Sequence, residues 1–233
     1  SNDYIFHLAK KYPNYFDPVI SVHPYRKDAL QELRKGAARG AKMVKWLPNA
    51  MGIDPSDPLC IPFYDTLKEL NMTLLTHAGE EQAVASEEGQ KLGNPLRVRS
   101  PLDRGVKVII AHGASRGLGE DLDKADKPKV ENFELFARLM DEERYQDLLF
   151  ADISALTLYH RIHRPLRTLL ERDDWHPRLV NGSDYPLPAI NFLIQTGTME
   201  EVGYLNNAER DALNEIYHYN PLLFQQDFGY TPN

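Results

Sequence analysis

Three side chains at the ends of apolar segments could together hold a metal ion. His77 ends residues 72–77, His112 ends residues 106–112, and Asp184 ends residues 178–184, directly before Tyr185 and Pro186. Neutral imidazole nitrogen and carboxylate oxygen are ligands of zinc and other divalent ions, and a strand-end carboxylate can also act as a general base. Each residue alone is explained as well by a hydrogen-bonded core or turn position. The three together favour a metal site.

The segments that carry these residues alternate with helical segments along the chain. Strands are predicted at residues 18–23, 41–47, 72–77, 106–112, 148–154 and 178–184, and helices at residues 3–11, 28–39, 61–70, 131–145, 164–172 and 208–224. This alternation implies parallel strands, in either a barrel or a doubly wound sheet. No glycine-rich phosphate loop follows any of the strands, which favours the α/β barrel.

Alternation of side chains predicts which residues share a face of each strand. Residues 73, 75 and 77 form one set, residues 108, 110 and 112 a second, and residues 180, 182 and 184 a third. Each set ends in a polar group beyond apolar or small residues. We therefore expect all three sets to point into the barrel, with two imidazoles and one carboxylate in its last layer.

Length, charge and cysteine content limit the class of protein. With 233 residues, of which 42% are hydrophobic, one barrel domain over residues 1–233 is expected. A net charge of −7 without a Lys/Arg-rich run argues against binding to nucleic acid or to an anionic membrane surface. Cys60 is the single cysteine, which predicts a reducing compartment, the cytoplasm. No apolar run approaches the length of about 18 residues typical of a membrane span.

Three motifs, in chain order, resemble those of the amidohydrolase superfamily of metal-dependent hydrolases. They are Leu-Leu-Thr-His-Ala-Gly at 74–79, Val-Ile-Ile-Ala-His-Gly at 108–113 and Asn-Gly-Ser-Asp-Tyr-Pro at 181–186. The similarity also includes residues 40–48 and runs from about Tyr12 to about Phe224. It is closest to the amidohydrolase-related branch, which also contains metal-dependent decarboxylases. The resemblance implies a TIM-type (β/α)8 barrel.

The chain departs from this family at its N-terminal side. Family members carry a His-x-His pair at the end of the first strand, and this sequence has none. Counting back from Asp184 as the end of strand eight makes residues 18–23 strand three. The resemblance therefore implies that strands 3–8 are present and that strands 1–2 are missing upstream, in a fragment of a longer protein or in a truncated homologue.

The resemblance also implies roles for the candidate residues. His77 would be the fifth-strand metal ligand, and His112 the sixth-strand histidine that binds metal or orients the attacking water. Asp184 would ligate the ion and take the proton from its water. One divalent ion, zinc by preference, is expected. A second ion would be bridged by Lys45 if this lysine is carboxylated, as in some members; the alternative role of Lys45 is to bind a substrate anion.

Other residues are candidates for contact with a substrate. His23, Arg26 and Arg116 lie on predicted strand-end loops and could hold a substrate carboxylate, and Tyr185 could wall a pocket. The acidic residues Glu80, Glu81 and 121–126 are predicted to be solvated loop charges.

Three functions remain open from the sequence. The first is a metal-dependent hydrolase of a C–N or ester-type bond in a small molecule, with a metal-activated water and Asp184 as base. The second is a metal-dependent non-oxidative decarboxylase on the same site, and the third is a metal-free binding or scaffold barrel. The resemblance, together with the two open edges of a six-stranded barrel, predicts a homodimer.

Overall fold

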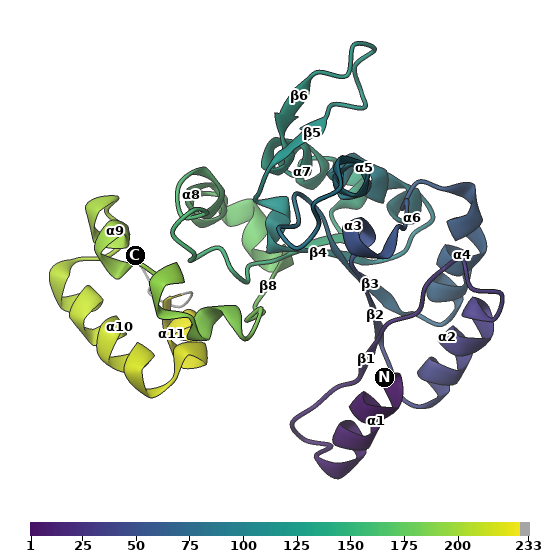
Figure 1. Cartoon of the computed structure of the whole chain (residues 1–233), viewed down its shortest axis with the longest axis horizontal. Coiled ribbons are helices and arrows are strands. Elements are labelled where there is room, and N and C mark those ends of the chain that lie inside the picture. The colour runs from purple at the N-terminus through teal and green to yellow at the C-terminus, as the bar shows by residue number, and fades with distance from the viewer. Residues whose placement is uncertain (229–233) are drawn as a thin grey trace. The chain divides into compact units, whose positions relative to one another are not determined.

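The structure of the protein is a computed structural model that describes residues 1–228, without the side chains of residues 191 and 225–228. The chain divides into two compact units, unit 1 over Ser1–Ala151 and unit 2 from Asp152 onward (Figure 1). No helix among the described residues combines the length and the apolar character needed to cross a membrane.

Unit 1 is an α/β unit whose parallel strands follow one another in chain order. The strands β1 (Val19–Ile20), β2 (Met43–Trp46), β3 (Thr73–His77), β4 (Val108–Ala111) and β7 (Leu149–Asp152) pair as successive neighbours. The helices are α1 (Asn2–Lys11), α2 (Ala29–Ala38), α3 (Pro48–Met51), α4 (Ile61–Glu69), α5 (Glu87–Leu92), α6 (Arg99–Asp103) and α7 (Asn132–Met140), and α2 and α4 lie side by side (Figure 1). The parallel α/β arrangement agrees with the sequence prediction.

One face of this sheet is covered by helices and completely buried. The paired residues Trp46, Thr76, Ile110 and Ala151 are at most 1% exposed. The indole of Trp46 packs on Phe63 and Tyr64 of α4, at centroid distances of 4.9 and 5.9 Å.

The opposite face of the sheet is more open. The next row of partners contains Lys45, Leu75, Ile109 and Phe150, and Lys45, Leu75 and Phe150 are only half-buried. His77, two residues beyond Leu75, extends this open face at the carboxyl end of β3.

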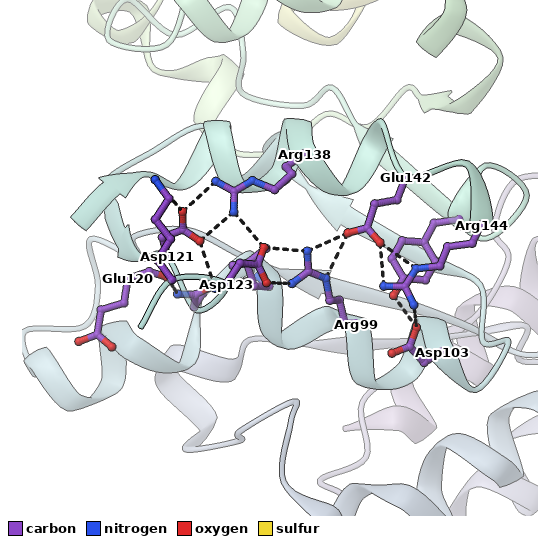
Figure 2. Close-up of polar contacts among 12 residues, drawn as sticks. Arg99, Asp103, Glu120, Asp121, Asp123, Arg138, Glu142 and Arg144 are labelled. Atoms are coloured by element: carbon purple, nitrogen blue, oxygen red, sulfur yellow. Dashed lines mark hydrogen bonds and ion pairs between the residues drawn. The ribbon is translucent and has the colours of Figure 1, made fainter. Parts of the chain in front are cut away.

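An antiparallel hairpin that the sequence did not predict is inserted between β4 and α7. Its strands are β5 (Leu118–Glu120) and β6 (Lys129–Glu131), and a chain of alternating charges joins its loop to α7 and α6 (Figure 2). Arg138 donates two hydrogen bonds to Asp121, of 2.8 and 2.9 Å, and one to Asp123, of 2.9 Å. Arg99 then bridges Asp123 and Glu142.

The prediction that residues 121–126 are solvated is wrong for Asp121. Its side chain is fully buried. The hydrogen bonds from Arg138 hold the pKa of the Asp121 carboxyl at about 2, below its ordinary value of 3.8. The sequence does not reveal this pairing because Arg138 lies 17 residues further along the chain.

Unit 2 contains one short strand and four α-helices among the described residues. They are α8 (Arg164–Glu171), β8 (Leu179–Val180), α9 (Thr196–Glu201), α10 (Asn207–Tyr219) and α11 (Pro221–Phe228). Within this unit, the amide of Ile153 donates to the carbonyl oxygen of Val180 at 3.0 Å. Asn206 caps α10 by a reciprocal pair of hydrogen bonds with Glu209. The predicted helix over 208–224 is interrupted before Pro221, as expected.

Candidate active site

His77 is presented by the last position of a buried parallel strand. Its side chain is 5% exposed, and its ring lies 5.6 Å from the ring of His112 in an edge-on arrangement. The two histidines come from neighbouring strands, because His77 pairs in register with Ala111, the residue before His112. Unit 1 thus brings the two predicted imidazoles together at the carboxyl ends of β3 and β4.

The predicted facing of β4 is wrong, although His112 still reaches His77. Leu75 pairs with Ile109, so Val108 and Ile110 lie on the helix-covered face and not on the face of Leu75. His112 leaves the strand in the left-handed region, at φ 56°, where residues other than glycine are uncommon. Side chains alternate between the two faces only where the backbone is an extended strand. The left-handed backbone at His112 ends that alternation, so its imidazole can point toward His77.

The prediction that the two glutamates after β3 are solvated is wrong for Glu81, whereas the Glu80 side chain is 42% exposed. Oε2 of Glu81 lies 3.8 Å from Nε2 of His77, and the Glu81 side chain is 23% exposed. Oε1 of Glu80 lies 3.4 Å from Nε of Arg116. Sequence reasoning missed Glu81; the signal that could have found it is Gly79, a turn residue between the strand end and the acid.

Four of the predicted contact residues lie in unit 1. In His23, Nε2 lies 2.9 Å from the carbonyl oxygen of Met51 and Nδ1 accepts from the Tyr25 amide at 3.3 Å. The exposed Arg26 is paired with Asp28 at 2.7 Å. Arg116 faces Glu80, and Lys45 lies in the row of residues on the open face of the sheet.

In unit 2, Asp184 follows β8 in a left-handed turn. Its φ is 51°, its carbonyl oxygen accepts from the amide of Leu187 at 3.0 Å, and its side chain is half-buried. The next residue, Tyr185, is 63% exposed. A left-handed backbone at a residue other than glycine costs of order 1 kcal/mol and is concentrated at functional sites. His112 and Asp184 share this feature at the exits of their own strands.

A second acid lies close to the β8 exit within the same unit. Asp152 is buried, and Oδ1 and Oδ2 accept from the amide and the hydroxyl of Ser154. A Cβ atom on Gly182 would collide with the Asp152 carboxylate, so a larger residue there would displace this side chain. Both Asp152 and Ser154 lie within residues 148–154, a segment that the sequence predicts to be a strand.

The side chains in unit 1 have the donor chemistry of a divalent metal site. His77 and His112 supply two imidazoles, and Glu81 supplies a neighbouring carboxylate. Within residues 1–228, no three His, Cys, Asp or Glu side chains are already gathered as a metal-binding group. These three side chains match such an ion in donor type and in their position at the strand ends, but the structure does not gather them as a metal-binding group.

Comparison with known proteins gives the fold class. No family model and no curated protein matches the sequence. Among solved structures, an uncharacterised TIM-barrel protein from Bordetella bronchiseptica aligns with a TM-score of 0.60 and 18% identity, over 98% of this chain and 73% of that one. The chain has the TIM-barrel fold. The α/β barrel class predicted from the sequence is thus confirmed.

Two further solved structures with this fold carry the names of enzyme classes. A protein from Staphylococcus aureus assigned as an amidohydrolase aligns with a TM-score of 0.53 and 15% identity, covering 90% of this chain and 74% of that one. The 4-oxalomesaconate hydratase from Rhodopseudomonas palustris aligns with a TM-score of 0.51 and 16% identity, covering 97% and 71%. At these identities the likeness concerns the fold. One of these structures is named as an amidohydrolase, and amidohydrolases are the group that the sequence motifs resemble.

Proposed function

We propose that this protein is a metal-dependent hydrolase that cleaves a C–N or ester-type bond in a small molecule. The observation that carries the proposal is the pair of buried imidazoles, His77 and His112, at neighbouring strand ends. In a TIM barrel, the carboxyl ends of the strands are where active sites are built. The fold likeness to an assigned amidohydrolase supports the reaction class.

Each residue has a separate role in this proposal. His77 binds the ion, and His112 either binds it or orients the attacking water. Asp184 accepts the proton of that water and then delivers it to the leaving group. When bound, a divalent ion lowers the pKa of water from about 15.7 to about 7, so a carboxylate can collect the proton at neutral pH. The support for Asp184 is its place at a strand exit of its own unit, in a left-handed turn.

The remaining assignments follow from the same proposal. We propose one barrel domain over residues 1–233, one zinc ion, and Lys45 as an anion-binding residue unless a second ion is present. Tyr185, beside Asp184, is the proposed aromatic wall for the substrate, with Arg26, Arg116 and His23 as further contacts. A cytoplasmic location and a homodimer remain predictions.

A lyase reaction on the same site is the second candidate. It is favoured by the fold likeness to a hydratase, an enzyme class that does not hydrolyse its substrate. For a decarboxylase, the ion would bind the acid substrate and Asp184 would transfer a proton to the product carbon. Release of carbon dioxide without consumption of water would distinguish this reaction from hydrolysis.

The test is a screen of the full-length protein against nitrophenyl esters, N-acyl compounds and small carboxylic acids, with zinc or manganese added. Asp184→Asn should lower metal-dependent turnover by about 10²–10⁴-fold, the range for loss of a general base. The exposed Glu201→Gln, also in unit 2, is the matched control and should retain activity. Hydrolysis that is unaffected by Asp184→Asn or by chelators would refute the proposal.

A further inference from the structure

Glu81 is turned back toward His77 by a tight backbone turn at Gly79. Gly79 has φ 91°, and a Cβ atom there would lie 2.9 Å from the carbonyl oxygen of Arg116. The Gly79 amide donates to the carbonyl oxygen of Gly93 at 2.7 Å. The contacts of Gly79 with Arg116 and with Gly93 therefore fix the loop after β3 immediately before Glu81.

The backbone of Glu81 is held by one side chain of α5. The Gln90 carboxamide accepts from the Glu81 amide at 3.0 Å and donates to the Glu81 carbonyl oxygen at 2.7 Å. Asn49, after β2, donates both to the Gln90 carboxamide at 3.0 Å and to the carbonyl oxygen of Gly79 at 3.1 Å. Side chains of α3 and α5, which follow the neighbouring strands β2 and β3, thus fix the position of this acid.

The carboxylate of Glu81 is also oriented. Oε1 accepts from the Ala83 amide at 3.0 Å, while Oε2 lies 3.8 Å from Nε2 of His77. A separation of 3.8 Å is too long for a hydrogen bond, which spans about 2.7–3.2 Å. Two ligand atoms at about 2.1 Å from one tetrahedral ion lie about 3.4 Å apart. The separation is therefore close to that of two ligands of a shared ion.

We propose that Glu81 is a metal ligand beside His77, so that unit 1 contributes a carboxylate to the ion from its own residues. This inference rests on the proposed metal dependence of the protein. It divides the acids between two tasks: Glu81 contributes to affinity for the ion, and Asp184 contributes mainly to proton transfer. Sequence motifs alone assign both tasks to Asp184.

The test measures binding of Co²⁺ and Zn²⁺ to the full-length protein by calorimetry and by the visible spectrum of bound Co²⁺. Glu81→Gln keeps the size of the side chain and an oxygen acceptor for Ala83, and it should weaken Co²⁺ binding at least 30-fold and change the spectrum. Glu80→Gln is the matched control, because its carboxylate faces Arg116, and it should bind Co²⁺ within about threefold of the wild type. Asp184→Asn should weaken binding less than Glu81→Gln does.

The outcomes separate this inference from the proposed function. If His77→Asn abolishes binding while Glu81→Gln and Glu81→Ala bind Co²⁺ like the wild type, the role of Glu81 is refuted and the metal site stands. If the wild type binds neither ion, both the proposed metal dependence and the role of Glu81 are refuted. Thermal unfolding of each variant checks that lost binding does not reflect a lost fold.

Discussion

Replacement of Asp121 by asparagine should destabilise unit 1 at neutral pH and have little effect in acid. Asp121 is fully buried and receives two hydrogen bonds from Arg138 (Figure 2). Asparagine keeps the shape of the side chain but removes its charge, leaving the Arg138 guanidinium with Asp123 as its remaining acidic partner.

The magnitude follows from the pKa of Asp121, which Arg138 lowers from 3.8 to about 2. One pKa unit corresponds to 1.36 kcal/mol, so the ionised pair contributes about 2 kcal/mol to the free energy of unfolding. Because the pKa in the folded state lies below that in the unfolded state, this contribution is complete above about pH 5. It is lost as the pH falls from about 4 toward about 2.

The assay is urea unfolding followed by tryptophan fluorescence, with Trp175→Phe in every variant so that Trp46 reports unit 1 alone. Asp121→Asn should lower the free energy of unfolding by about 2–3 kcal/mol at pH 7 and by much less at pH 2.5. Asp126→Asn is the matched control in the same loop, since Asp126 is exposed, and it should change stability by less than about 0.5 kcal/mol. Equal stabilities of Asp121→Asn and Asp126→Asn at pH 7 would refute the reasoning.

Three further predictions concern other parts of unit 1. Gly79→Ala should cost about 1–3 kcal/mol, because its φ is positive and the added Cβ would press on the Arg116 carbonyl oxygen; urea unfolding checks this, and an unchanged midpoint would contradict it. Gln90→Ala should raise the rate of amide hydrogen exchange in residues 79–84 at least 10-fold, because it removes two hydrogen bonds to the backbone of Glu81. Equal exchange rates in the variant and the wild type would contradict this. Burial raises the pKa of the Cys60 thiol to about 11, so the folded protein should react with a thiol reagent at pH 8 at least 100-fold more slowly than the urea-unfolded chain; comparable rates would contradict this.

Local sequence patterns predicted the main elements because those elements have local causes. The helix predicted over 28–39 is α2 (Ala29–Ala38), and the helix predicted over 164–172 is α8 (Arg164–Glu171). Apolar periodicity, together with Pro165 in the first turn of α8, marks them without reference to the rest of the chain. The parallel strands followed from their alternation with helices.

The features that were missed depend on partners far along the chain. The strands of the β5–β6 hairpin have few apolar residues, and the acidic residues 121–126 between them predict only a solvated loop. Asp121 is buried only because Arg138 neutralises it, and sequence patterns do not encode that pairing. The contact of Glu81 with His77 depends on the turn at Gly79 and on Gln90, and the direction of His112 depends on its left-handed backbone.

The most direct test of the account is the metal content of the full-length protein after dialysis against micromolar Zn²⁺, compared with the double variant His77→Ala, His112→Ala. We predict close to one zinc per chain in the wild type and a loss of nearly all of it in the variant, with retained secondary structure. A wild type without bound zinc, or a variant that binds as much as the wild type, would contradict the claim that these strand-end histidines form a metal centre.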